Sequence, residues 1–444
     1  MHYDVAIVGL GYVGLTLATA LADVGFKVLG VERDAAVVQA VNDGNPHFSE
    51  NGLAEMLAHA VEMGRFQALE AFTEDVSADI YVITVGTPLR DGGKARLDFI
   101  EAAARAVAWN MPDGALVVLR STVKIGTARN VVAPILARSG KDFGIAMCPE
   151  RTLEGRAMNE LRRLPQIVGA DTPEVRERAA HFFYKLTPTA VQVSSLEAAE
   201  IIKLVDNTYR DVQFGFANEV ARICDVYGVN AMEVIPGGKL GYERTNVALP
   251  GLVGGPCLEK DPHILAQSLR EAGVELDITT AARRVNERQP IETVDWILTE
   301  HARRAERAPR IALLGVAFKG VPATDDLRGA MSLAVLSALR NRAPKADIRL
   351  FDPVCTAQQL QAEAPCCTIA PDLEAAITEA DIAIIANNHP VLATWRPRQM
   401  QRVMAETGFI YDYWNHFSDL RPYELGPNYF AVGNTGTREP MVRA

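Results

Sequence analysis

The chain has 444 residues and a formal net charge of -10, and 48% of its residues are hydrophobic and 23% charged. This composition is typical of a globular protein of two or three domains, and the acidic balance argues against binding to nucleic acid. No apolar run reaches the roughly 18 residues of a membrane span and no signal-peptide pattern opens the sequence, so we expect a cytoplasmic protein without membrane partners. The six cysteines lack CxxC spacing, which indicates free thiols and no metal site.

The N-terminal residues predict a dinucleotide-binding unit. A strand is expected over residues 3–8, followed by a GxGxxG turn and an apolar helix to about Val24. Gly9 permits the tight turn, Gly11 lets a pyrophosphate approach the backbone, and Gly14 permits close packing of helix on strand. The glycine motif alone is weak evidence, but the strand before it and the helix after it make the prediction specific.

The strand expected over residues 27–31 bears on the choice of cofactor. It ends at Glu32, eighteen positions after the last glycine of the turn, where dinucleotide folds hold the ribose diol with a carboxylate. This carboxylate would repel the 2′-phosphate of NADP, whereas the neighbouring Arg33 carries the opposite charge. We therefore predict NAD as the cofactor, with NADP as the alternative, and assign Tyr12 and Val13 of the turn to the same site.

Further apolar runs predict a largely parallel, doubly wound sheet. Strands are expected over residues 79–84, 115–119, 143–147 and 166–168. Because ligands bind beyond the carboxyl ends of such strands, polar residues at three strand exits are candidates for the site. They are Thr87 and Pro88, Ser121 and Thr122, and Pro149 and Glu150. Taken singly, each pair is also ordinary turn chemistry.

A long helix is predicted over residues 196–227. It carries Glu200, Lys203, Asn207 and Arg210 at spacings that place them on one face. Such a stripe is either a solvated face or the polar wall of a site. In the second case, Lys203 and Asn207 supply a cation and an amide donor suited to a developing oxyanion.

One cysteine occupies a position suited to a nucleophile. Cys257 follows the pair Gly254-Gly255 and precedes a helix start, with Asp261 expected as N-cap and Pro262 as the first helical residue. The partial positive charge of a helix N-terminus favours a thiolate. The alternative is a small buried hydrophobic residue, which is how most free cysteines behave.

A second α/β unit is predicted after a polar stretch over 301–309. It opens with a strand and glycine turn over 310–319, and further strands are expected over 348–351, 382–386 and 409–411. We therefore predict an α/β protein with two Rossmann-like doubly wound domains, joined by a central long helix and helical segment. The expected domains are residues 1–190, 191–300 and 301–444.

These motifs together resemble the UDP-glucose/GDP-mannose dehydrogenase family of nucleotide-sugar 6-dehydrogenases, over nearly the whole length. The resemblance rests on the glycine turn and on seven further segments at joint spacing: Gly86-Thr87-Pro88, Ser121-Thr122-Val123, Pro149-Glu150, Glu200 to Leu204 with Asn207, Gly254 to Cys257 with Lys260-Asp261, Phe318-Lys319, and Asp325 to Arg328. It implies an NAD-binding domain over 1–190, a central dimerisation and catalytic segment over 191–300, and a UDP-binding domain over 301–444.

The resemblance implies a four-electron oxidation of a sugar C6 alcohol to a carboxylate with two NAD in succession. Cys257 would form a thiohemiacetal and then a thioester, and Lys203 and Asn207 would stabilise the oxyanions. Asp261 and Thr122 would hold or activate the water or the hydroxyl, and Glu150 would assist proton transfer. Which of these groups is the base stays open.

The resemblance also assigns binding residues. The cofactor site would comprise Gly9, Gly11, Tyr12, Val13, Gly14, Glu32, Arg33, Thr87, Thr122, Glu154 and Arg328. The UDP-sugar site would comprise Glu154, Lys203, Asn207, Arg210, Arg244, Gly254, Phe318 and Lys319. The family pattern further implies a homodimer or larger homo-oligomer built across the long helix.

The signatures of the sugar are mixed. The segments Asn207 to Val212, Phe216 to Glu219 and Cys148 to Arg151 are similar to the branch that acts on UDP-N-acetylhexosamines, in particular UDP-N-acetylmannosamine. Lys260 and Glu154 are closer to the UDP-glucose branch. We expect an N-acetylhexosamine, with UDP-glucose 6-dehydrogenase as the alternative.

Two rival functions remain, because a dinucleotide fold does not determine a reaction. One is a two-electron dehydrogenase related to the 6-phosphogluconate or hydroxyacid enzymes, in which Lys203 and Asn207 act and Cys257 only packs. The other is a noncatalytic nucleotide-sugar sensor. The joint presence of Cys257, Lys203, Asn207 and Asp261 argues against the sensor.

Overall fold

The computed structural model describes residues 1–90 and 94–436. The chain forms two compact units: unit 1 comprises Met1–Asn207 with His263–Glu275, and unit 2 comprises Thr208–Pro262 with Leu276–Ala444. Each unit contains one large sheet of mainly parallel strands covered by helices, which confirms the predicted α/β class with two Rossmann-like sheets.

In the described part of unit 1, the large sheet has eight strands in the order β10-β9-β8-β7-β4-β1-β2-β3. Its strands are β1 (His2–Val8), β2 (Val28–Val31), β3 (Phe66–Leu69), β4 (Ser77–Ile83), β7 (Ala115–Leu119), β8 (Phe143–Met147), β9 (Gln166–Gly169) and β10 (Ala190–Val193). All neighbours are parallel except β8 and β9. The stretch β3-β2-β1-β4 carries the order expected of a dinucleotide-binding sheet.

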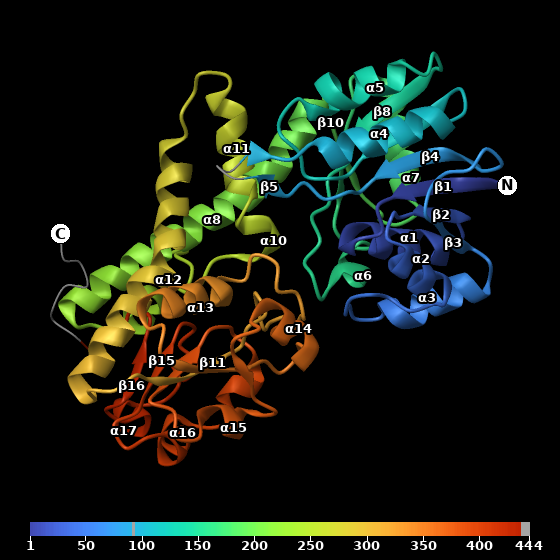
Figure 1. The fold of residues 1–444 in the computed structure, drawn as a ribbon. Helices are drawn as coiled ribbons and strands as arrows, with labels where there is room; N and C mark the ends of the chain where they lie inside the picture. Colours follow the sequence, from blue (N-terminus) through green and yellow to red (C-terminus); the bar gives the residue numbers. More distant parts are fainter. Residues whose placement is uncertain (91–93, 437–444) are drawn as a thin grey trace. The chain divides into compact units, whose positions relative to one another are not determined.

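Helices cover both faces of this sheet (Figure 1). The helices of unit 1 are α1 (Tyr12–Asp23), α2 (Ala35–Asn42), α3 (Leu53–Glu62), α4 (Asp98–Asn110), a π-helix (Ala128–Val132), α5 (Ala133–Ala137), α6 (Ala157–Glu160) and α7 (Pro173–Phe183). Alternate β1 residues face opposite sides, because successive strand side chains alternate. Val5 and Ile7 pack with α1, α3 and α7, while Ala6 and Val8 pack with α4 and α5.

The sheet of unit 2 has six described strands, all parallel, in the order β13-β12-β11-β14-β15-β16. They are β11 (Arg310–Leu314), β12 (Asp347–Phe351), β13 (Thr368–Ile369), β14 (Ile382–Ile385), β15 (Phe409–Asp412) and β16 (Tyr429–Ala431). In chain order this is the arrangement 3-2-1-4-5-6 of dinucleotide-binding folds. The second unit is therefore Rossmann-like in topology as well as in composition.

The helices of unit 2 follow the same plan (Figure 1). They are α9 (Ala231–Lys239), α10 (Gly255–Leu258), α12 (Asp277–Arg304), α13 (Met331–Arg342), α14 (Ala357–Glu363), α15 (Leu373–Ile377), a 3₁₀ helix (Pro390–Ala393), α16 (Pro397–Val403) and α17 (Pro422–Leu425). Ile311 and Leu313 pack with α12 and α13, whereas Ala312 and Leu314 pack with α15 and α16.

Two helices run from one unit into the other along the chain. Helix α8 (Leu196–Tyr227) starts in unit 1 and ends in unit 2, and α11 (Asp261–Arg270) starts in unit 2 and ends in unit 1. The bounds of α8 are those predicted from the sequence. A short hairpin, β5 (Leu89–Arg90) with β6 (Lys94–Ala95), was not expected. Within the described residues, no helix is both long and apolar enough to cross a membrane.

The acid that follows β12 is occupied by its own turn. Asp352 accepts backbone N–H groups of Val316 and Ala317 at 2.7 and 2.9 Å through one carboxylate oxygen. Its other oxygen accepts those of Val354 and Cys355 at 2.8 and 2.9 Å. The residue that in a dinucleotide-binding unit faces the ribose is thus a brace of the glycine turn after β11.

Candidate active site

The glycine turn of unit 1 fits a pyrophosphate. Gly9 has φ +94°, and a Cβ there would lie 2.9 Å from Val85 Cγ1. A Cβ on Gly14 would lie 1.8 Å from the carbonyl oxygen of Gly9, so this position requires glycine for packing. A Cβ on Gly11 would meet nothing within 4 Å. The backbone at Gly11 is therefore open to a ligand at the start of α1, as the motif predicts.

Glu32 lies at the end of β2, where the sequence places a ribose-binding acid. Its carboxylate accepts the backbone N–H of Leu10 at 2.9 Å and that of Asp34 at 3.3 Å. Arg33 lies with its guanidinium carbon 4.7 Å from the centre of the Phe99 ring, and Arg96 lies 4.6 Å from the same centre. Glu32 is thus held against the glycine turn, and Arg33 is held on an aromatic ring.

The segment after β8 is tied to the glycine turn through a buried acid. Glu50 accepts the backbone N–H groups of Gly155 and Ala157 at 2.6 and 3.0 Å, and also the hydroxyl of Tyr12. Burial, together with the hydrogen bond and charge of Glu50, raises the pKa of Tyr12 well above its usual range. The charge of Glu154 acts in the same direction, so Tyr12 and Glu154, both predicted at the cofactor, lie close together in unit 1.

The exits of β4 and β7 are joined by hydrogen bonds. Thr87 Oγ1 donates to the carbonyl oxygen of Thr122 at 2.5 Å, and Ser121 Oγ donates to that of Val85 at 2.6 Å. Thr87 is buried and Thr122 is half-buried. The structure therefore brings two of the predicted site residues, Thr87 and Thr122, to one edge of the sheet.

Glu150 forms a buried ion pair that the sequence did not reveal. Arg120, only 2% exposed, donates from Nε to Glu150 at 3.0 Å and from Nη1 to Gln166 Oε1 at 2.8 Å. Burial alone would raise the pKa of Glu150, but the Arg120 guanidinium, the backbone N–H of Thr152 and the charge of Lys203 outweigh it and lower the pKa. Glu150 is thus held as a carboxylate near Lys203.

The polar stripe of α8 is mostly buried. Glu200 accepts the backbone N–H groups of Gly126 and Ala128 at 2.5 and 2.9 Å, and burial raises its pKa to about 7. Lys203 and Asn207 are also buried, whereas Arg210 is exposed. The stripe is therefore a polar wall over its first three members and solvated only at Arg210.

In unit 2, Cys257 lies in the short helix α10 and is exposed. Helix α11 begins at Asp261 itself, so Asp261 is its first residue rather than the N-cap we expected. Lys260 Nζ lies 2.6 Å from Asp261 Oδ1. Burial lowers the pKa of Lys260, but Asp261 and the Cys257 sulfur beside it raise the pKa above its usual value.

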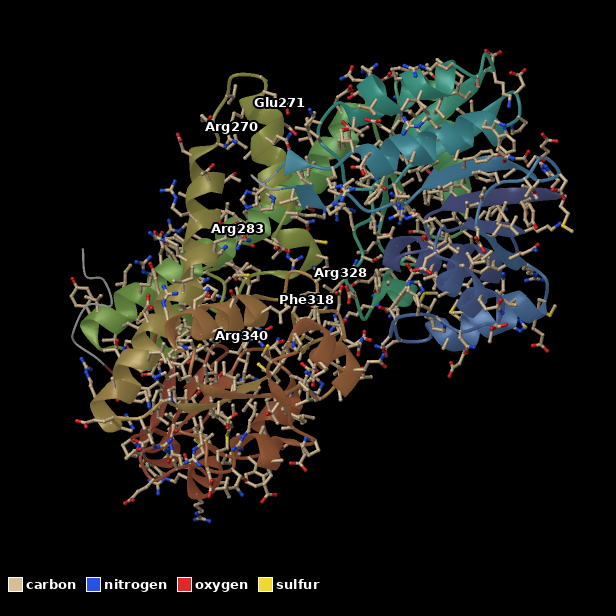
Figure 2. All side chains as sticks on the ribbon, in the orientation of Figure 1. Arg270, Glu271, Arg283, Phe318, Arg328 and Arg340 are labelled. Atoms are coloured by element: carbon tan, nitrogen blue, oxygen red, sulfur yellow. The ribbon has the colours of Figure 1, made fainter. Side chains whose placement is uncertain are left out.

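The glycine pair before Cys257 packs against the loop that follows β11. A Cβ on Gly254 would lie 2.3 Å from the carbonyl oxygen of Gly329, and one on Gly255, whose φ is +89°, would lie 2.5 Å from the Phe318 ring. The backbone N–H of Gly255 donates to Gly329 O at 2.7 Å. Figure 2 labels Phe318 and Arg328, which come from this loop. Two motifs far apart in the sequence thus meet within unit 2.

The remaining predicted cations differ in their surroundings: Lys319 and Arg328 belong to the loop that packs against the glycine pair, and the charge of Arg328 acts on Lys260. Lys319 Nζ lies 5.1 Å from the centre of the Phe318 ring, and Arg328 pairs with Asp326 at 2.5 Å. Arg244 is exposed and its guanidinium stacks on Tyr242 at 4.6 Å. In the part of the chain that the structure describes, neither Arg210 nor Arg244 forms a hydrogen bond or ion pair with the Cys257 segment.

The predicted site residues are divided between the units. Unit 1 contains the glycine turn, Glu32, Arg33, Thr87, Thr122, Glu150, Glu154, Lys203 and Asn207. Unit 2 contains Arg210, Arg244, Gly254, Cys257, Asp261, Phe318, Lys319 and Arg328. The sequence did not single out Glu50, Arg120, Asp211 or Arg283, all of which are buried polar residues with organising contacts.

Comparison with known proteins identifies the family. The models of the UDP-glucose/GDP-mannose dehydrogenase family match along the chain: the NAD binding domain at residues 3–187, the central domain at 197–288 and the UDP binding domain at 312–419. The chain is similar to the UDP-N-acetyl-D-mannosamine dehydrogenase of Pyrococcus horikoshii, with 33% identity over 399 residues, which cover 87% of this chain and 89% of that relative.

Comparison with solved structures gives the same family. A structure of the UDP-D-ManNAc dehydrogenase from Pyrococcus horikoshii matches with a TM-score of 0.87 and 30% identity, covering 98% of this chain and 100% of that one. A UDP-glucose dehydrogenase from Pyrobaculum islandicum matches with a TM-score of 0.86 and 28% identity, covering 98% of each. With the glycine turn that fits a pyrophosphate, these matches show that the chain belongs to the UDP-glucose/GDP-mannose dehydrogenase family of NAD-dependent oxidoreductases.

Proposed function

We propose that the protein is a UDP-N-acetylmannosamine 6-dehydrogenase, which oxidises the sugar C6 alcohol to a carboxylate. The observation that carries the proposal is the exposed thiol of Cys257, which lies next to the Lys260 ammonium in a segment fixed by its glycine pair. A thiol that a ligand can reach is what addition to an aldehyde requires. The alternative of a two-electron dehydrogenase gives this cysteine no task.

The reaction balances over two oxidations. One hydroxymethyl group, two NAD⁺ and one water yield a carboxylate, two NADH and three protons. NAD bound at the glycine turn would supply the hydride acceptor for both oxidations at C6. The Cys257 sulfur forms a bond to the C6 aldehyde and gives a thiohemiacetal. The second oxidation converts this into a thioester, and water then breaks the C–S bond and restores the thiol.

The polar residues of both units have separate roles. Lys203 and Asn207 donate to the oxygen that carries negative charge in the thiohemiacetal and in thioester hydrolysis. Glu150, held ionised by Arg120, stabilises the Lys203 ammonium and takes or returns protons through water. Asp261 and Thr122 orient the hydroxyl or the water. Glu154, Arg210, Arg244, Gly254, Phe318 and Lys319 bind the UDP-sugar, and Arg328 adjoins the cofactor.

The choice of sugar rests on similarity in sequence. The relative from Pyrococcus horikoshii acts, by its name, on UDP-N-acetyl-D-mannosamine, and it matches most of the chain. The fold alone does not distinguish between the two sugars, because the TM-score to a UDP-glucose dehydrogenase is almost the same as that to the UDP-D-ManNAc dehydrogenase. We therefore place UDP-N-acetylmannosamine first and use UDP-glucose as the comparison substrate.

We also infer a homodimer that forms through α8. Tyr209, Phe216 and Ile223 follow one another at intervals of seven residues and are 61%, 54% and 57% exposed. Large apolar side chains in a row on one helix face are typical of a surface that is covered in an assembly. Residues 1–190, 191–300 and 301–444 would then serve as cofactor, central and UDP-binding parts of each subunit.

The test counts NADH formed per sugar consumed, with UDP-N-acetylmannosamine, UDP-N-acetylglucosamine, UDP-N-acetylgalactosamine, UDP-glucose and GDP-mannose. We expect two NADH per UDP-N-acetylmannosamine. Cys257→Ser should lower this turnover by at least about a hundredfold while NAD still binds, because the thioester can no longer form. Cys366→Ser is the matched control, since Cys366 is also exposed but lies outside the segment.

Three outcomes contradict the proposal in distinct ways. Two NADH with a different sugar would reassign the substrate and keep the reaction. A ratio of one NADH that Cys257→Ser leaves unchanged would favour the two-electron dehydrogenase. Binding of a UDP-sugar without NADH formation from any member of the panel would favour the sensor.

A further inference from the structure

Arg283 is a buried cation next to Cys257 to which the proposed reaction gives no role. It lies on α12 and is labelled in Figure 2. Its side chain is buried, with 3% of the residue exposed. Nη1 donates to the carbonyl oxygen of Leu258 at 2.8 Å, and Nη2 donates to that of Val253 at 3.0 Å. These two carbonyls stand on either side of the glycine pair and Cys257. One guanidinium therefore fastens both ends of the segment that carries the nucleophile.

The guanidinium is itself fixed by an acid on α8. Arg283 Nη1 donates to Asp211 Oδ1 at 2.7 Å, and Asp211 is fully buried. Asn286 Nδ2 donates to the same oxygen at 2.9 Å and to the backbone oxygen of Asp211 at 3.0 Å. Glu287, one turn along α12, lies 3.3 Å from Arg283 Nε. The planar donor set of Arg283 is thus held in one orientation by α8 and α12.

The hydrogen bonds of Arg283 are better explained by a role in positioning the Cys257 segment than by a contribution to the free energy of unfolding. Burying an ion pair costs solvation that its attraction often only offsets, so stability alone is a weak reason for its presence. An ammonium group could pair with Asp211, but it lacks the rigid fork that reaches two carbonyls on one side and a carboxylate on the other. Leu258 O is also the last carbonyl of the four-residue helix α10, where no further helical N–H is available.

The same segment is also held by the loop after β11. Gly255 N–H donates to Gly329 O at 2.7 Å, and a Cβ on either glycine would collide with Gly329 O or the Phe318 ring. The segment is therefore held both by Arg283 and by the loop after β11, and Cys257 lies between the two carbonyls that Arg283 binds.

We propose that Arg283, oriented by Asp211, is a positioning residue that sets the direction of the Cys257 thiol. It acts through the carbonyls of Val253 and Leu258 and touches no reacting atom. The proposal rests on the proposed function for its chemical consequence: the first oxidation needs no thiol, whereas bond formation between Cys257 sulfur and the C6 aldehyde does. Loss of Arg283 should therefore uncouple the two oxidations and release aldehyde.

The experiment compares Arg283→Lys with Arg288→Lys, the same change on the same helix at an exposed residue. For Arg283→Lys we expect NADH per sugar to fall from two toward one. Aldehyde should be trapped by hydroxylamine, and turnover to acid should fall about ten- to a hundredfold, because a misplacement of about 1 Å has effects of this size. The KM for the UDP-sugar should stay within about twofold. Arg288→Lys should match the wild type.

A second measurement does not depend on the reaction. Amide hydrogen exchange over residues 254–260 should become at least about tenfold faster in Arg283→Lys, with no change over α13. If Arg283→Lys fails to fold, the double variant Asp211→Asn/Arg283→Met takes its place, because it removes both buried charges together.

The two proposals can fail separately. Unchanged exchange at 254–260, or an unchanged ratio of two NADH per sugar, overturns the role of Arg283 and leaves the dehydrogenase intact. An equal loss in Arg288→Lys also overturns it. Faster exchange at 254–260 in Arg283→Lys, together with a wild-type protein that makes no NADH, supports the positioning role and removes the proposed function.

Discussion

The roles of single residues could be predicted from the sequence where the residues belong to a short local motif. Gly9, Gly14 and Cys257 stand in such motifs, and the structure gives each glycine a contact that forbids a Cβ. Arg120 and Arg283 were not predictable, because each follows apolar or helical residues without any sign of its partner. Arg120 meets Glu150 across two strands, and Arg283 meets Asp211 across two helices. Such pairs arise only when the sheets and helices have assembled.

Glu32→Ala should weaken NAD binding by about tenfold to a hundredfold. A charge-assisted hydrogen bond contributes about 1.5–3 kcal/mol, and this variant removes the carboxylate predicted to hold the ribose diol. The measurement is a fluorescence titration with NADH, with UDP binding as the control. Glu32→Gln separates the two tasks of the residue, since its amide oxygen still accepts the N–H of Leu10. Unchanged NADH affinity in both variants would refute the ribose assignment.

Long elements were predictable and short ones were not. The apolar pattern of α8 extends over 32 residues, so its bounds follow from periodicity. The π-helix Ala128–Val132 has no such pattern. The turn that leads into it is fixed by Glu200 of α8, which accepts the N–H groups of Gly126 and Ala128. The hairpin of β5 and β6 and the helix α10 are equally short, and tertiary hydrogen bonds rather than propensity decide them.

The anchor between α8 and this turn should depend on pH. Burial raises the pKa of Glu200 from 4.5 to about 7, so between these values the folded chain keeps a proton that the unfolded chain releases. Stability therefore decreases as pH rises through this window, by up to about 3 kcal/mol. Glu200→Gln, which is neutral at every pH, should lack this dependence.

The comparison is made by urea unfolding at pH 5, 6, 7 and 8. The free energy of unfolding of the wild type minus that of Glu200→Gln should become smaller from pH 5 to pH 8. Asp225, whose pKa burial raises to about 6, is present in both proteins and cancels in the difference. A difference that stays constant with pH would show that the carboxyl of Glu200 titrates in its ordinary range, and one that grows with pH would show that folding lowers its pKa.

The architecture of the whole molecule was predictable from the sequence for an identifiable reason. Both sheets repeat one strand order, and each is built from apolar runs that alternate with helical patterns. The division of the predicted catalytic residues between two compact units was not predictable, since α8 and α11 each run from one unit into the other. The local sequence of a helix does not show at which residue the helix leaves one compact unit and enters the next.

The proposed homodimer is tested by charge on the apolar row of α8. Phe216→Glu/Ile223→Glu should convert the dimer into a monomer at micromolar concentration, because two carboxylates would have to be buried at the interface. Light scattering after gel filtration measures the mass, and circular dichroism checks the fold. Tyr423→Glu, at an exposed apolar residue on α17, is the control. A dimeric double variant would place the interface elsewhere.

The brace formed by Asp352 has an electrostatic consequence for the second sheet. A free carboxylate at a strand end would repel the diphosphate of a nucleotide bound along that edge. Each carboxylate oxygen of Asp352 accepts two backbone N–H groups. The dipoles of these groups offset much of the negative potential of the carboxylate within the turn. Unit 2 therefore has the strand order of a dinucleotide-binding domain, but the sheet edge beside Asp352 repels a bound anion less than a free carboxylate would.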